Sequence, residues 1–120
     1  MNTKKTLILM LIVLAISLLA TSCNPTCTFT AHYQVEIYRV PDASTPVWGV
    51  EAPGYPHTID ARTADGWIGY DPGVAQAPNV GLARNRYFQL NAIVTPSCLA
   101  SVPLVTIADV EADIAASGGP

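Results

Sequence analysis

The chain has 120 residues, with six lysines and arginines against nine aspartates and glutamates, which gives a net charge of −3 at pH 7. Its only lysines, Lys4 and Lys5, lie at the start, so the rest of the chain sets four arginines against all nine acidic side chains. Such a surface repels phosphate backbones, which argues against nucleic acid as a partner. The length of the chain allows one small domain.

The first 22 residues have the three-part layout of a secretory signal. Lys4 and Lys5 form a short positive segment, an uncharged run rich in Leu and Ile follows over 6–20, and small residues end it at Ser22. The run is shorter than the roughly 20 apolar residues that a transmembrane helix needs. We therefore expect residues 1–22 to be a cleaved signal helix and residues 23–27 to be a short tether.

Cys23 directly follows these small residues. The stretch Leu19-Ala20-Thr21-Ser22-Cys23 resembles the lipobox of bacterial lipoproteins, although Ala20 stands where that motif usually has Leu. The resemblance implies that Cys23 is lipidated after export. The lipid would hold the protein to a membrane of the bacterial cell envelope, on its extracytoplasmic side. The alternative is cleavage by an ordinary signal peptidase, which would leave a soluble secreted module.

The chain has three cysteines, an odd number for an exported protein. If Cys23 carries lipid, Cys27 and Cys98 are left to form a disulfide in the oxidising exported environment. Two alternatives stay open: a Cys23–Cys27 pair, which would close a very small loop and stabilise little, and a zinc site that adds His32 and His57. The zinc ligands lack the short paired spacing of such sites, so we predict no metal and no cofactor.

Short segments rich in β-branched and aromatic residues alternate with Pro/Gly turns in the rest of the chain. Ala64-Asp65-Gly66 separates two of them, and an Asp-Gly pair there favours a β-hairpin. No amphipathic helix of normal length is visible. The pattern predicts an all-β fold, a small barrel over 28–107, and a flexible acidic and Gly-rich tail over 108–120. The expected strands cover 28–40, 47–50, 58–63, 67–70, 83–87 (a strand or a 3₁₀ turn), 88–94 and 102–107.

Three stretches, "YRVPDASTPVWGVEAPG", "RTADGWIGYD" and "VGLARNRYFQL", resemble the bacterial SH3-like (SH3b) domain, in a region from Tyr33 to Val94. Gly66-Trp67 matches the Gly-Trp hairpin of that family, while the "PGVAQAPN" insertion and Leu82 depart from its pattern. The resemblance implies a small SH3-like barrel that acts as a non-catalytic binding module. Cell-wall peptide (peptidoglycan) and other envelope proteins are the partners that it implies.

Aromatic side chains beside the turns are the candidate ligand contacts, because flat aromatic faces can bind an extended peptide. These residues are Tyr38, Tyr55, Trp67 and Tyr70. The aromatic residues within apolar alternation are instead expected in the core, and these are Tyr33, Trp48 and Phe88.

Arg84 and Arg86 are two residues apart and would share one face of a strand. They are expected to be solvated and paired with Asp71, although two arginines on one face could also bind a carboxylate.

The motifs of the common hydrolases, metalloproteases and nucleotide-binding enzymes are missing from the sequence, so we predict no enzyme activity. The favoured function is that of a membrane-anchored exported lipoprotein with an SH3b-like binding module. The alternative is a structural or accessory envelope lipoprotein without a small ligand, which pairs through a barrel edge or through residues 108–120.

Overall fold

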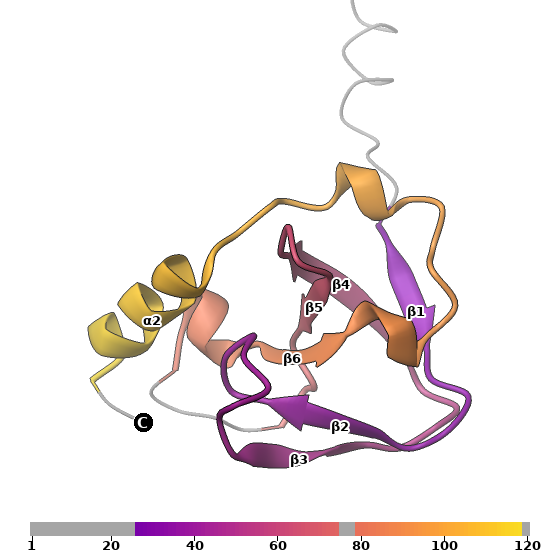
Figure 1. Ribbon diagram of the computed structural model, residues 1–120, viewed down its shortest axis with the longest axis horizontal. Helices are drawn as coiled ribbons and strands as arrows, with labels where there is room; N and C mark the ends of the chain where they lie inside the picture. The colour runs from indigo at the N-terminus through magenta and orange to yellow at the C-terminus, as the bar shows by residue number, and fades with distance from the viewer. Residues whose placement is uncertain (1–25, 75–78, 119–120) are drawn as a thin grey trace, which may run out of the picture.

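The computed structural model describes residues 26–74 and 79–118, which form a curled antiparallel sheet of six strands with one α-helix against it (Figure 1). The sheet closes about half of a small barrel. Cys23 and the signal peptide predicted over 1–22 lie outside the described residues. The elements, with η for a 3₁₀ helix, are β1 (Thr28–Thr30), β2 (Val35–Tyr38), β3 (Val47–Glu51), β4 (Pro56–Arg62), β5 (Trp67–Tyr70), η1 (Gly81–Arg84), β6 (Arg86–Gln89), η2 (Leu90–Ala92), η3 (Leu99–Ser101) and α2 (Ile107–Ala116).

The strands are ordered β1-β4-β5-β6-β2-β3, and each neighbouring pair is antiparallel. The hairpin predicted around Asp65-Gly66 is confirmed as the β4–β5 turn. Gly66 has a φ of 91°, a conformation that glycine adopts without steric cost. The Trp67 amide donates a hydrogen bond of 3.0 Å to the Thr63 side chain across this turn. In the described part of the sheet, β1 and β3 are the two edge strands.

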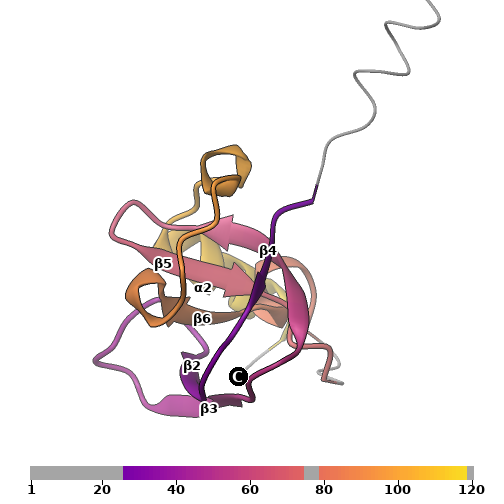
Figure 2. The ribbon, with the colours of Figure 1, turned by 90° about the vertical axis from the view of Figure 1, so that its right-hand side faces the viewer.

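The predicted single strand over 28–40 is wrong, because the chain bends after Ala31 and forms two strands, β1 and β2. β1 pairs with β4, with Phe29 opposite His57, whereas β2 pairs with β3 and β6. Figure 2 shows β1 running across the open side of the curl before the chain turns into β2. One continuous strand cannot pair with β4 near one edge of the curled sheet and with β3 near the other, so the chain breaks between β1 and β2. The alternation of residue types does not show where this break falls.

The concave face of the sheet carries the larger core. Phe29, Ile37, Ile59, Ile68 and Phe88 pack there, and each is at most 6% exposed. Residues 93–104, which we call the disulfide loop, cover this core with Val102 and with the partly buried Ile93 and Leu99.

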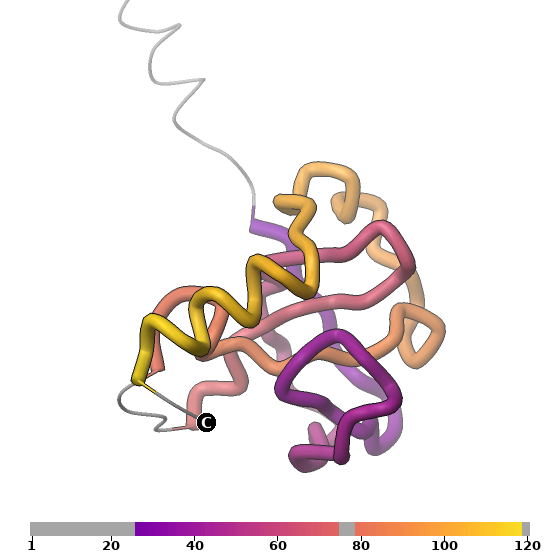
Figure 3. Tube along the Cα trace, turned by 60° about the vertical axis from the view of Figure 1, so that its left-hand side comes forward, coloured from indigo at the N-terminus to yellow at the C-terminus, as the bar shows by residue number. Residues whose placement is uncertain are grey.

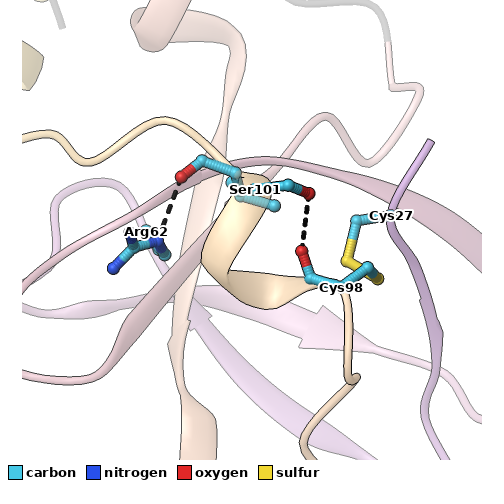
Figure 4. The surroundings of a disulfide bond; sticks show 5 residues. Cys27, Arg62, Cys98 and Ser101 are labelled. Carbon is cyan, nitrogen blue, oxygen red and sulfur yellow. Dashed lines mark hydrogen bonds between the residues drawn. A yellow bond between two sulfur atoms is a disulfide. The ribbon is translucent and has the colours of Figure 1, made fainter. Parts of the chain in front are cut away.

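The predicted Cys27–Cys98 disulfide is confirmed and joins the disulfide loop to the start of β1, with the two Cα atoms 5.6 Å apart. Arg62 of β4 also holds the loop, because its Nε donates to the Val102 carbonyl oxygen at 3.0 Å (Figure 4). The strand expected over 102–107 is wrong: Leu104 forms only an isolated bridge to Arg62. The loop is therefore fixed without regular strand structure.

The convex face is covered by α2, so the flexible tail predicted over 108–120 is wrong for residues 108–116, which are helical. Val110 of this helix is fully buried against Trp67 and Tyr87. A capping box starts the helix: the Asp109 amide donates to Thr106 Oγ1 at 3.2 Å, and the Thr106 amide donates to Asp109 Oδ2 at 2.9 Å. Figure 3 shows α2 lying along η1, where the Leu82 amide donates to Asp113 Oδ2 at 2.8 Å.

The strand predicted over 88–94 lies earlier, because β6 runs from Arg86 to Gln89 and a 3₁₀ turn follows at Leu90–Ala92. Its side chains serve both cores, with Phe88 on the concave face and Tyr87 on the convex face. Gly69 of β5 lies under the Tyr87 ring, where a Cβ would be 2.5 Å from Tyr87 Cε1. Glycine is needed at this position so that the ring can approach the strand.

Candidate functional site

An open groove of about 440 Å³ lies between edge strand β3 and the start of β4. Its rim is apolar and solvent-accessible, with exposed fractions of 41% for Trp48, 52% for Val50, 63% for Tyr55 and 57% for Val74. Pro56 and Pro72 complete this rim. Exposed aromatic and aliphatic side chains beside an open strand edge form a surface suited to an extended chain.

Trp48 is held in place by a buried arginine. The guanidinium carbon of Arg86 lies 4.1 Å from the centroid of the Trp48 ring, within the range of a cation–π contact. Arg86 is 1% exposed, and its Nη1 donates to the carbonyl oxygens of Ala83 at 3.1 Å and Asn85 at 2.7 Å. Burial, and then the nearby charge of Arg39, lower the pKa of the Arg86 guanidinium to about 10. The cation is therefore present at neutral pH and orients the indole ring.

Glu51, which is 9% exposed, places a carboxylate in the lining of the groove. The Tyr70 hydroxyl donates a hydrogen bond of 2.7 Å to Glu51 Oε1 from inside the barrel. His57 Nε2 lies 3.0 Å from the same oxygen, but this contact lacks the geometry of a hydrogen bond. Burial, followed by the Glu51 interaction, raises the pKa of the Tyr70 hydroxyl, so Tyr70 remains the donor.

The imidazole of His57 stands within an aromatic cluster that fixes its position. Its ring centroid is 5.0 Å from that of Tyr70 and 5.7 Å from that of Phe29. Phe29 and Tyr70 themselves pack edge to face at 5.0 Å. Strand β1 supplies Phe29, β4 supplies His57 and β5 supplies Tyr70, and of the three only His57 lines the groove, so the buried Phe29 and Tyr70 rings support it from the core.

The four predicted ligand contacts do not share one surface. Tyr38 and Trp67 pack edge to face at 5.4 Å on the convex side of the sheet, where Trp67 is 5% exposed. Tyr70 is fully buried on the concave side and reaches the groove only through its hydrogen bond to Glu51. Tyr55 alone is both exposed and part of the groove.

The core predictions are partly wrong. Phe88 is buried as expected, but Tyr33 is 57% exposed and Trp48 lies on the groove rim. In a strand as short as β3, alternation separates two faces without showing which one is buried, so it does not reveal that Trp48 lies on the groove rim. Arg84 and Arg86 do not share a strand face either, because Arg84 belongs to η1 and Arg86 to β6.

A second hollow, of about 510 Å³, lies beside the β4–β5 turn. Its walls include Trp67, Asp65, Gln89 and Asn91, but Trp67 offers almost no exposed surface there. The groove beside β3 combines exposed aromatic side chains with a fixed carboxylate, and we therefore regard it as the candidate binding site.

Within residues 26–74 and 79–118, no cluster of three or more His, Cys, Asp or Glu side chains could hold a metal ion. The one α-helix of this part is too short to cross a membrane, and no described helix meets the length and hydropathy needed for a span. Comparison with protein-family models, with curated protein sequences and with solved structures gave no match.

Proposed function

We propose that this protein is an exported bacterial lipoprotein, anchored at Cys23, whose SH3b-like half-barrel binds an extended peptide of the cell wall. The observation that carries the proposal is the pair of exposed aromatic side chains, Trp48 and Tyr55, on the rim of a groove that also contains Glu51. Flat aromatic faces contact an extended backbone without requiring it to fold, and the open edge of β3 offers backbone hydrogen bonds to such a chain.

The charged side chains in and near the groove indicate which kind of ligand it can bind. Glu51 is held by Tyr70 and is nearly buried, so its carboxylate would interact strongly with an ammonium group that enters the groove. Arg86 is covered by Trp48, so its positive charge does not face the ligand directly. The groove therefore favours a peptide that carries an amino group, such as the diamino acid of a cell-wall peptide.

Co-sedimentation of the exported protein with isolated cell-wall sacculi tests this proposal. Tyr55→Ala should weaken binding about tenfold or more, as expected for an aromatic contact at the centre of an interface. Tyr33→Ala is the matched control, because Tyr33 is 57% exposed and lies outside the groove. Equal binding by both variants would contradict the groove as the site.

Glu51→Gln tests the expected amino group separately. The substitution removes the charge but keeps an oxygen that can accept the Tyr70 hydroxyl. Binding to sacculi should fall for this variant and should lose part of its dependence on salt concentration. An unchanged affinity and an unchanged salt dependence would show that the ligand presents no cation to Glu51.

The anchor is tested by detergent-phase partitioning. The wild type should enter the detergent phase, and Cys23→Ala should abolish this partitioning. If the substitution changes nothing, the proposed anchor is refuted. A wild type that stays in the aqueous phase would identify a soluble secreted module instead.

A second candidate function is that of an accessory envelope lipoprotein that pairs with another protein through β3. The observation in its favour is that β3 is an edge strand with Val47 and Val50 both about half exposed. Cross-linking on intact cells separates the two functions. A protein adduct at Val47, together with no binding to sacculi, would support protein pairing over peptide binding.

A further inference from the structure

The disulfide loop belongs to a long segment without charge. No Asp, Glu, Lys or Arg occurs between Arg86 and Asp109, although the chain outside the first 22 residues is strongly acidic overall. After β6 this segment runs along β1, and its η3 turn lies at one end of the barrel beside the start of β1 (Figures 1 and 2). The loop therefore adds no charge of its own to this end of the barrel, where Arg62 of β4 is the charged side chain that contacts it.

The Cys27–Cys98 bond places this uncharged loop next to the proposed lipid anchor. Cys27 follows Cys23 by four residues, and a chain of that length spans at most about 14 Å. The Cα atom of Cys98 lies only 5.6 Å from that of Cys27. If acyl chains on Cys23 enter a bilayer, the disulfide loop must lie within a short distance of its surface.

The exposed side chains of the loop suit an apolar boundary. Leu104 is 56% exposed and Val94 is 77% exposed, and Ala100 of η3, which lies between them in the sequence, is also exposed. The carbonyl oxygens of Val102 and Ala100 accept hydrogen bonds from the Arg62 side chain at 3.0 and 3.5 Å. Irregular backbone near a bilayer needs such internal partners, because lipid offers few hydrogen bonds.

We propose that the disulfide loop is the membrane-facing surface of this protein and rests on the lipid headgroups, with Ala100 and Leu104 toward the bilayer. This inference depends on the proposed anchor at Cys23. The groove beside β3 lies at the opposite end of the barrel (Figures 1 and 2), so the same orientation turns Trp48 and Tyr55 away from the membrane. The bilayer is the one partner that the short tether brings to this surface.

Photo-cross-linking of the full exported protein in phosphatidylcholine vesicles tests the inference. One variant carries a benzophenone amino acid in place of Leu104, and the matched control carries it in place of Val74 on the groove rim. The two positions are 56% and 57% exposed, so solvent access does not separate them. We expect lipid adducts at position 104 to exceed those at position 74 by about fivefold or more. Equal yields, or a higher yield at position 74, would overturn the proposed orientation.

The intact mass of the same samples separates the two proposals. A protein with acyl groups on Cys23 but equal lipid labelling at both positions would keep its anchor and lose its membrane-facing loop. A protein without acyl groups and without lipid adducts would refute both. The mass under non-reducing conditions also reports the Cys27–Cys98 bond, which confirms that each variant retains the folded loop.

Discussion

The two faces of the sheet are covered in different ways. The concave face is closed by the disulfide loop, which has almost no regular structure and is joined to β1 by a covalent bond. The convex face is closed by α2, which satisfies its own backbone and is positioned by Val110 and a capping box. A segment that makes few hydrogen bonds of its own needs a cross-link to stay on the core, whereas a helix needs only a buried side chain and a defined start.

Removing the disulfide that holds the loop on the concave face should have the largest effect on stability. The double substitution Cys27→Ser, Cys98→Ser should lower the free energy of unfolding by about 4 kcal/mol, because a bond between residues 71 apart strongly restricts the unfolded chain. Urea unfolding measures the change. Wild type in reductant should match the double variant. A loss near zero would mean that the loop covers the concave core without the bond.

The contribution of α2 to stability should depend mainly on the packing of its buried side chain. Val110→Ala should cost about 2 kcal/mol, because the side chain is fully buried between Trp67 and Tyr87. Val80→Ala is the matched control, since Val80 is 55% exposed and should change the unfolding free energy by less than about 0.5 kcal/mol. Similar losses in both variants would contradict a specific role for Val110.

The start of α2 should contribute less than its packing. Thr106→Ala removes the acceptor for the Asp109 amide and should cost about 1 kcal/mol. The control is Thr95→Ala, which changes an exposed threonine of the disulfide loop that caps no helix. This substitution should change the free energy of unfolding little. Thermal unfolding followed by circular dichroism compares the two variants. A larger loss of stability for Thr95→Ala than for Thr106→Ala would contradict the proposed role of the capping box.

The smallest effect concerns pH. The disulfide loop has no titrating side chain, so the pH dependence of stability must come from other parts of the fold. Burial, and then the nearby Asp71 charge, raise the pKa of the Asp60 carboxyl in β4. A raised pKa in the folded state means that stability increases as pH falls through that pKa. Asp60→Asn should therefore stabilise the protein slightly at pH 7, and the gain should shrink toward pH 4. Glu111→Gln is the control, and a gain for Asp60→Asn that is independent of pH would refute this cause.

Part of this architecture follows from local sequence signals. The Asp65-Gly66 turn and the β-branched segments around it specify the β4–β5 hairpin, and the two cysteines that remain beside the proposed anchor Cys23 imply the disulfide. The helix was missed because its segment is small and acidic, with Val110 and Ile114 as its main apolar contacts. A signal was present, since Thr106 and Asp109 have the spacing of a capping box.

The groove could not be predicted from the sequence. The short turn over 52–55 joins β3 to β4, but the groove also needs Ile37 of β2 and the Pro72 and Val74 side chains after β5, and only the tertiary fold brings these to the same place. The Arg86–Trp48 contact likewise joins two strands that are distant in sequence. Contacts of this kind are set by tertiary packing, which the periodicity of single strands does not record.

The disulfide also determines how the protein responds to mechanical load. If Cys23 is the anchor that we propose, a pull between it and the C-terminal end would pass from Cys27 directly to Cys98, bypassing every residue between them. Only the segment after Cys98, which includes α2, would extend under such tension. The groove beside β3 lies inside the closed covalent ring, so such a pull would leave it folded.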